Sequence, residues 1–500
     1  MDYQDLLLFQ PHSLLLLLLL FLSSAYFLLI RHLATKSLPK NLPPGSLGWP
    51  LIGETFEFLS GNPEEFIQQR LEKYATGGAA VAQVFKTNIL GERTIFFSGP
   101  AASKLIANNE LKLVKLWLPH SQKRLFAIDY TKAHQKSLHL MRPPPGATGT
   151  GFTRLYGFLK PEAKFVEKFD SMMRWELREH WEGHGGEVVR AYGLVKSFVL
   201  TLSCNNLLGM EPERSKKLTG KLDVIVNGLQ SIHVNFPGTV YHRAKKAVAE
   251  LGREIQLLIT ERTAADPVPA TEDFLSLLIA GNVDQSGKVI LRSTVANIAT
   301  GVMAASYGSV VTTITHMIKF VGLRPDVYDK IYSEQSEILT SRGGDALNWD
   351  HINRMKYTWA VACETMRIVT PFIGTFREVL TDFNFAGYTI PKGWKIFWAV
   401  NTSNKNPEYF PEPEKFDPSR FMENEQLPYT FQPFGGGPRM CAGKEWARLA
   451  ILIFMHNLVT KFKWEIINPN EKVLNGMVMP APVEGLPIRL HPLSSFVSPN

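Results

Sequence analysis

The stretch Phe434-Gly-Gly-Gly-Pro-Arg-Met-Cys-Ala-Gly443 contains the most informative residues of this 500-residue chain. Its consecutive glycines let the backbone approach a flat or bulky group closely. Cys441 follows this turn, directly before an apolar segment, residues 444–462, that reads as a helix. A thiolate near a helix N-terminus is stabilised by the helix dipole and by free backbone N–H groups. The spacing alone fits a metal-ligating thiolate and an ordinary buried cysteine equally well.

The cysteine count and the charge narrow the class of protein. Cys204, Cys363 and Cys441 are the only cysteines, and they form no Cys-x-x-Cys pair, so a disulfide framework or a structural zinc site is not expected. The net charge is +8, and the basic residues are scattered rather than interleaved with aromatic residues in a run. A membrane surface or an acidic protein partner is therefore favoured, and no nucleic-acid partner is expected.

The N-terminus differs in kind from the rest of the chain. Residues 13–30 read SLLLLLLLFLSSAYFLLI, and as a helix they would span roughly 27 Å, close to the hydrocarbon core of a bilayer. Basic residues follow this run and Asp2 and Asp5 precede it, which places the body of the protein in the cytosol. A cleaved signal peptide is the alternative, but the acidic start and the long run favour an uncleaved anchor.

We expect three parts: an anchor with a basic flank (residues 1–40), a proline-rich hinge (41–54) and one large body (55–500). Prolines and glycines in the hinge cannot continue a helix. The body is expected to be mainly α with small β-sheets. Helical patterns cover residues 165–181, 218–234, 244–263, 293–321, 327–340, 355–369 and 444–462. Strand patterns cover residues 81–85, 94–97, 383–385, 388–390 and 395–399.

The Cys441 stretch resembles the haem-binding signature of the cytochrome P450 family, Phe-x-x-Gly-x-Arg-x-Cys-x-Gly, at every fixed position. Glu364-Thr-Met-Arg367 is similar to the family's Glu-x-x-Arg, whose side chains lie on one helix face. Pro418-Ser-Arg-Phe421 resembles the Pro-x-Arg-Phe element that follows it. The resemblance covers essentially the whole chain. Residues 235–238, 375–378 and 431–452 look like the plant microsomal lineage that holds triterpenoid and taxane oxidases.

The resemblance implies a membrane-anchored monooxygenase of the endoplasmic reticulum with its catalytic body in the cytosol. Haem b would be bound through the Cys441 thiolate, which donates electron density to the iron. Electrons would come from NADPH through NADPH-cytochrome P450 reductase. Arg420 would join the Glu364–Arg367 pair. The other cofactor-binding residues implied are Phe434, Gly435, Gly437, Arg439, Gly443, Arg377 and His134.

The central helix departs from the family pattern. The family usually carries an acid followed by threonine there, and this chain has Gly308 and Ser309. Glycine at 308 would widen the groove, and Ser309 keeps a hydroxyl as the catalytic candidate. Three hypotheses follow: a monooxygenase in which Ser309 and water suffice, an O₂-independent isomerase or dehydratase, and a catalytically poor paralogue. A non-catalytic membrane protein that binds a lipid or a partner P450 is a further alternative.

Residues 134–158 also depart from the family. The fourth residue after His134 is Leu138 instead of the usual arginine, and residues 142–151 (RPPPGATGTG) read as a true insert or a gene-model artefact.

A bulky apolar substrate, a di- or triterpenoid, is the expected ligand. The expected pocket residues, carried over by position from the family, are Trp117, Ala304, Ala305, Phe372, Ile373, Met477, Val478 and Met479.

Overall fold

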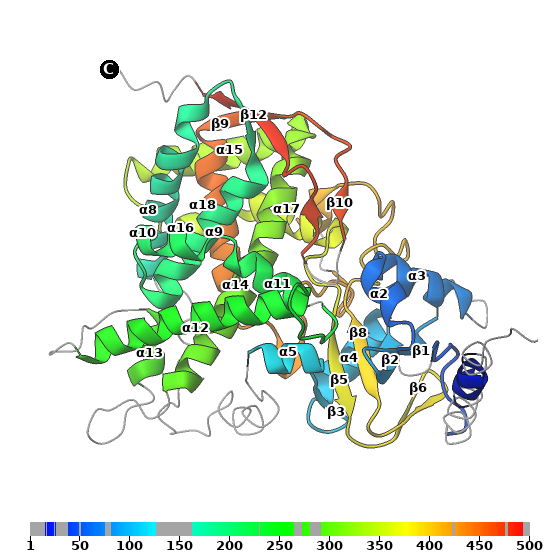
Figure 1. Ribbon diagram of the computed structural model, residues 1–500. Coiled ribbons are helices and arrows are strands. Elements are labelled where there is room, and N and C mark those ends of the chain that lie inside the picture. The colour runs from blue at the N-terminus through cyan, green and yellow to red at the C-terminus, as the bar shows by residue number, and fades with distance from the viewer. Residues whose placement is uncertain are drawn as a thin grey trace, which may run out of the picture.

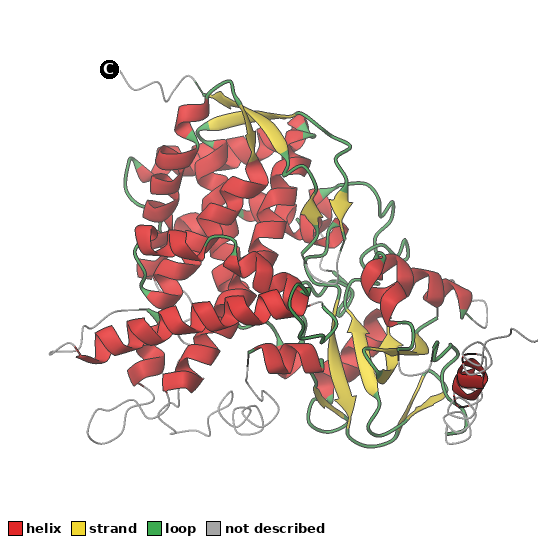
Figure 2. Cartoon of the chain, viewed as in Figure 1, coloured by secondary structure: helices red, strands yellow, loops and turns green. Residues whose placement is uncertain are grey.

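The computed structural model describes residues 16, 18–24, 26, 39–49, 52–75, 82–126, 163–229, 231–264, 273–280, 292–422, 426–475 and 479–493. Helices make up most of the described body. The largest sheet lies beside them in a smaller part, and another small sheet lies at one end of the helical part (Figures 1 and 2). The mainly α prediction is therefore confirmed. The α-helices are α2 (Thr55–Ser60), α3 (Pro63–Lys73), α4 (Gly99–Asn108), α5 (His120–Leu125), α8 (Ala163–His180), α9 (Ala191–Leu208), α10 (Pro212–Ser215), α11 (Lys221–Leu229), α12 (Val240–Ala264), α13 (Phe274–Ala280), α14 (Arg292–Gly322), α15 (Pro325–Arg342), α16 (Trp349–Arg354), α17 (Lys356–Ile368) and α18 (Lys444–Val459).

The strands form small sheets. They are β1 (Val84–Ile89), β2 (Glu92–Phe97), β3 (Val114–Leu116), β4 (Val188–Arg190), β5 (Gly374–Val379), β6 (Phe383–Phe385), β7 (Tyr388–Ile390), β8 (Lys395–Ala399), β9 (Phe462–Ile466), β10 (Val473–Leu474), β11 (Ala481–Pro482) and β12 (Pro487–Pro492). The largest sheet has the order β1-β2-β8-β5-β3. Its β3–β5 pairing sets Leu116 opposite Arg377 and so brings the segment after α4 next to a predicted site residue.

Helix α14 runs through the middle of the helical part (Figure 1) and packs on α9, α12, α17 and α18. Every residue from 310 to 318 is buried, because neighbouring helices cover this half on all sides. Among the described residues, α14 is the one helix long and apolar enough to cross a membrane, but 67% of its most apolar window is buried inside the protein. A helix covered in this way is a core helix.

Several predicted boundaries were wrong, for identifiable reasons. The helix predicted over residues 444–462 ends at Val459, and Phe462 begins β9. In β9, Phe462, Trp464 and Ile466 are buried and the residues between them are exposed, which is the period of a strand. Helix α9 was missed because it is buried on nearly every face and carries no amphipathic stripe.

The predicted hinge packs against the sheet along its described residues. The Lys86 N–H donates to the Pro44 carbonyl oxygen at 2.7 Å, and the Glu54 N–H donates to the Asn88 carbonyl oxygen at 2.7 Å. A Cβ on Gly53 would lie 1.9 Å from that same Asn88 oxygen, so this close approach requires glycine. Half of the predicted anchor run, residues 13–30, lies outside the described residues.

Candidate functional site

The Cys441 loop is shaped by glycines at left-handed backbone angles. Gly435 and Gly437 both have φ +68°, and a Cβ on Gly437 would lie 2.3 Å from the Ala107 carbonyl oxygen of α4. A 3₁₀ turn, η5 (Gly437–Arg439), follows, and the Cys441 N–H donates to the Phe434 carbonyl oxygen at 2.9 Å. The loop therefore closes on itself and presents Cys441 directly before α18.

Cys441 differs from the other two cysteines in its surroundings. Cys204 and Cys363 are buried, and burial raises the pKa of each thiol to about 12, so both are inert. Cys441 is exposed. The surrounding loop desolvates its sulfur and raises its pKa, while a hydrogen bond from the Gly443 N–H lowers it. Cys441 is thus the exposed cysteine of the three, and its anion has a backbone donor.

Two buried arginines converge on one carboxylate next to this loop. Arg377 Nε lies 2.9 Å from Glu110 Oε2, and Arg439 Nε lies 3.2 Å from Glu110 Oε1. The Leu116 N–H also donates to Glu110 Oε1, at 3.1 Å. Burial lowers the pKa of the Arg377 guanidinium, and Arg439 adds to that effect. Two guanidinium groups against one carboxylate leave a surplus of positive charge, which suits a further anionic group.

The Glu364–Arg367 pair is fully buried on α17. Arg367 Nε lies 2.7 Å from Glu364 Oε2, and both side chains are 0% exposed. The Asp417 N–H donates to Glu364 Oε1 at 2.9 Å, and Arg420 Nε lies 3.5 Å from the same oxygen. This cluster therefore joins α17 to η4 (Pro418–Phe421), in the segment that leads to the Cys441 loop.

The central helix has one accessible face at its departure from the family pattern. Ala305 is exposed and Ser309, four residues on, is half-buried, so both lie on this face. Ala304 is 2% exposed and belongs to the main core cluster. The Thr313 hydroxyl donates to the Ser309 carbonyl oxygen at 2.9 Å. The Ser309 position is thus the accessible one and the Ala304 position is core.

The side chain of Met479 fills the space beside Gly308. A Cβ on Gly308 would lie 1.6 Å from Met479 Sδ and 2.2 Å from its Cε. The widening expected from glycine is therefore taken up by a methionine from the C-terminal turn. The neighbouring Tyr307 donates to Asp223 Oδ1 at 3.1 Å and so binds α11, on the side of α14 away from Ala305 and Ser309.

The predicted pocket residues are partly brought together. Trp117, Ile373 and Met479 pack in one apolar cluster, in which Trp117 and Ile373 are 3% exposed and Met479 is half-buried. Phe372 is 40% exposed. His134, Met477 and Val478, with residues 142–151, lie outside the described residues. Glu110 was missed, because a lone acid after a helix carries no motif.

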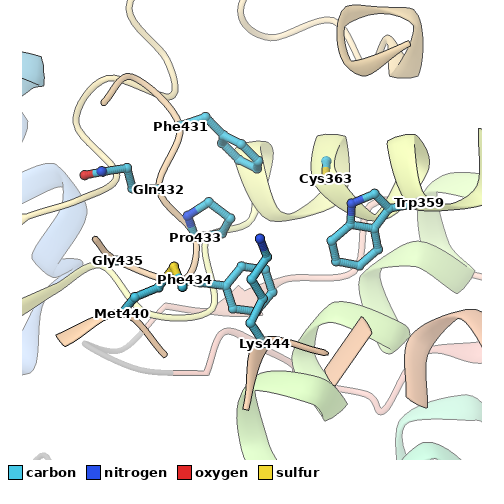
Figure 3. Close-up of a pocket in the computed structure, with 9 residues that line it drawn as sticks. All are labelled: Trp359, Cys363, Phe431, Gln432, Pro433, Phe434, Gly435, Met440 and Lys444. Carbon is cyan, nitrogen blue, oxygen red and sulfur yellow. The ribbon is translucent and has the colours of Figure 1, made fainter. Parts of the chain in front are cut away.

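An open pocket lies against the Cys441 loop (Figure 3). Trp359 and Cys363 of α17 line one side, and Lys444 of α18 lies between them and the loop. The Trp359 and Phe434 rings stack with centroids 6.4 Å apart. The loop residues in its wall are Phe431, Gln432, Pro433, Phe434, Gly435 and Met440. Phe434 and Gly435, which the sequence predicts as cofactor-binding residues, also line this pocket.

A family model described as Cytochrome P450 matches residues 43–484. This chain belongs to the cytochrome P450 family. Its P450 fold is also seen in a cyanobacterial P450 with bound retinoic acid (CYP120A1), with a TM-score of 0.75 and 24% identity, covering 91% of this chain and 100% of that one.

Characterised plant P450s resemble it along most of their length. A beta-amyrin 28-monooxygenase of Vitis vinifera is 40% identical, covering 93% of this chain and 95% of the relative. A beta-amyrin 6-beta-monooxygenase of Solanum lycopersicum is 40% identical, covering 91% and 93%. A beta-amyrin 28-monooxygenase of Medicago truncatula is 39% identical, covering 96% and 98%. The chain is thus a P450 monooxygenase that resembles a triterpenoid-oxidising lineage.

P450 monooxygenases carry a haem iron and receive electrons that originate from NADPH through a redox partner. The donor set described above fits this cofactor on two counts. Cys441 is the exposed cysteine, with a backbone N–H donor to its anion. Arg377 and Arg439 carry buried positive charge that would suit the anionic propionates.

Proposed function

We propose that this P450 oxidises a triterpenoid of the beta-amyrin type, inserting one atom of O₂ into its apolar skeleton. The observation that carries the proposal is the similarity, over more than nine-tenths of the chain, to relatives that bear beta-amyrin monooxygenase names. The relatives differ in the position oxidised, 28 in one and 6-beta in another, at the same 40% identity. The substrate class is therefore proposed, and the carbon is left to the product analysis.

Cys441 is proposed as the residue whose thiolate would hold the haem iron, and Arg377 and Arg439 as the residues that would hold its propionates. The bound haem supplies the oxidising chemistry, to which a thiolate ligand contributes electron density. The Gly443 N–H moderates the charge on the sulfur. His134 remains a proposed contact by position only.

Ser309 is proposed as the hydroxyl that passes protons on the accessible face of α14. Its position, four residues after the exposed Ala305, supports this role. The ordinary acid of this helix is replaced by Gly308, and the carboxylate of Asp223 is engaged by Tyr307 on another face. Ser309 and ordered water are therefore the proposed route.

The apolar side chains support a bulky, non-polar substrate. Trp117, Ile373 and Met479 belong to one apolar cluster. Phe372, which directly precedes Ile373 in the sequence, is exposed. Methionine adapts its shape to irregular ligands. An apolar ring system of triterpenoid size matches this chemistry better than a polar substrate.

Anchoring in the endoplasmic reticulum by residues 13–30, with residues 41–54 as hinge and residues 55–500 as cytosolic catalytic body, is also proposed. Trp49, Ile52 and Phe56 are strongly exposed large apolar residues next to the predicted anchor. They support a membrane surface close to this end of the body. NADPH-cytochrome P450 reductase is the proposed electron donor, and Lys444 at the rim of the open pocket supports an acidic partner.

The test is expression in yeast microsomes together with the reductase, followed by feeding of beta-amyrin. A reduced, carbon-monoxide-bound band near 450 nm and an NADPH- and O₂-dependent product one oxygen heavier are expected. Product formed without O₂ would favour the isomerase or dehydratase hypothesis. Correctly ligated enzyme that turns over no beta-amyrin would reject the substrate proposal.

A further inference from the structure

Gly308 and Met479 fit together as a hole and a knob. The would-be Cβ of Gly308 meets three atoms of one side chain, Met479 Sδ at 1.6 Å, Cε at 2.2 Å and Cγ at 3.0 Å. Real Cβ atoms do not approach other heavy atoms so closely, so any side chain at 308 requires Met479 to move. Shortening Met479 to alanine removes all three contacting atoms.

The backbone around Met479 is held on both sides. Its N–H donates to the Pro371 carbonyl oxygen at 2.9 Å, and the Thr312 hydroxyl donates to the next carbonyl oxygen, that of Pro480, at 3.3 Å. Met479 also has φ +65°, a left-handed conformation that a non-glycine residue adopts at a cost. The backbone at Met479 and Pro480 is therefore held between α14 and the segment after α17, and the Met479 side chain is the part that can move.

The contact borders the region where the substrate is proposed to bind. Ala305, about one turn before Gly308 on α14, is exposed, and Ser309, the residue directly after Gly308, is half-buried. Phe372, 40% exposed, directly follows the Pro371 that holds Met479. Trp117 and Ile373 belong to the apolar cluster against which Met479 packs. A Met479 side chain expelled from the hole at 308 would enter this accessible space.

We propose that the Gly308–Met479 pair determines substrate specificity by setting how much of the pocket beside α14 is open to a bulky apolar ligand. Because residue 308 is glycine, the Met479 side chain can pack against the helix, and the space in front of it stays open to the substrate. A larger residue at 308 expels Met479 and closes that space. The inference deepens the proposed function, since it names the residues that admit a polycyclic substrate.

The same helix offers a matched control. A Cβ on Gly322 would lie 2.7 Å from Trp464 Nε1 and 2.8 Å from Ile466 Cδ1, so this glycine is also crowded by side chains. It stands fourteen residues from Gly308, roughly 20 Å along the helix. Gly322→Ala therefore reports the cost of crowding α14 without touching the proposed pocket.

The first experiment is a thermal-unfolding cycle on the holoenzyme with Gly308→Ala, Met479→Ala and the double variant. Gly308→Ala is expected to lower Tm by a few degrees, as Gly322→Ala should. Met479→Ala is expected to restore Tm in the Gly308→Ala background and to leave the Gly322→Ala background unrestored. Additive Tm changes at 308 and 479 would reject the pair.

The second experiment measures binding to the ferric enzyme by difference spectroscopy, with beta-amyrin, a bulky triaryl azole and imidazole. Gly308→Ala is expected to weaken the binding of the bulky ligands by about tenfold. The binding of imidazole should change little, because imidazole does not occupy the space that Met479 would close. Met479→Ala should restore the bulky ligands in the double variant. Gly322→Ala should change neither class of ligand.

The outcomes separate this inference from the proposed function. Wild-type enzyme that binds the bulky azole but not beta-amyrin rejects the substrate, while the azole series still tests the pair. Equal weakening of imidazole and the bulky azole by Gly308→Ala would reject a specificity role. Restored Tm without restored azole binding would reject it too, and would leave the contact as packing alone.

Discussion

The Cys441 loop and the accessible face of α14 are built on different principles. The shape of the loop is set by its backbone, because left-handed glycines and a hydrogen bond within the same ten residues fix it. The shape of the α14 face is set by side chains, because the space beside Gly308 is filled by Met479, which is far away in the sequence. The loop therefore tolerates few changes of any kind, whereas the helix face can be reshaped by paired substitutions.

The largest effect is expected at the loop. Cys441→Ala and Cys441→His should abolish the 450 nm band of the reduced carbon-monoxide complex, because the thiolate is lost. Cys363→Ala, at the neighbouring open pocket, should retain it, since that thiol is buried and inert. A Cys441 variant with the full band would contradict the ligand assignment.

The next largest effect is expected at the buried Glu364–Arg367 pair of α17. Glu364→Ala leaves Arg367 buried without its carboxylate and should cost about 3–5 kcal/mol in the free energy of unfolding. Glu213→Ala breaks a pair of the same i,i+3 spacing, but there Glu213 is 80% and Lys216 57% exposed, and the cost should stay below about 1 kcal/mol. Denaturant titration of both variants gives the comparison, and equal costs would show that burial of the pair is unimportant.

Glu176 provides a buried carboxyl whose ion-pair partner is His180, at 4.0 Å, instead of an arginine. Burial raises its pKa to about 7, against the opposing effects of Ser197 and Lys216. The folded protein therefore binds the proton more tightly than the unfolded chain. This stabilisation is fully present below about pH 4.5 and is lost as pH rises through about 7, a change of about 3 kcal/mol. Glu176→Gln should flatten the pH dependence of unfolding, and Glu179→Gln, an exposed change on the same helix, should not.

Two glycines of the loop separate backbone strain from steric contact. Gly435 and Gly437 share φ +68°, but a Cβ on Gly435 meets nothing within 4 Å and one on Gly437 lies 2.3 Å from Ala107. Gly435→Ala should cost about 1 kcal/mol for the left-handed conformation alone. Gly437→Ala should cost about 1–3 kcal/mol more, because α4 has to shift. Equal melting temperatures would show that the loop adapts more than its geometry indicates.

The smallest effect is expected at the helix face. Ser309→Ala should reduce product formed per NADPH by about threefold to tenfold, less than the roughly 10²-fold typical of a sole acid–base residue, because water shares the role. Ser306→Ala is the control, since that hydroxyl contacts Ser203 Oγ at 3.2 Å, on α9. Indistinguishable coupling in the two variants would remove Ser309 from the proton route.

Features formed by consecutive residues were predictable from the sequence, whereas contacts between distant segments were not. The glycine loop and the Glu364–Arg367 pair were predictable because each lies within a few consecutive residues of one element. Glu110 was not, since Arg377 meets it through the β3–β5 pairing and Arg439 comes from η5, which packs on α4. Met479 was assigned to the pocket by position, but its place beside Gly308 depends on a turn docked across α14.

The fit of Met479 beside Gly308 also fixes the order in which changes at these two positions are accessible. An acid introduced at 308 first meets the Met479 thioether and has to pass through a strained intermediate. Shortening Met479 first opens the hole, after which aspartate enters at 308 without that conflict. To restore the usual acid of the family to this helix, Met479 should therefore be substituted first and Gly308 second.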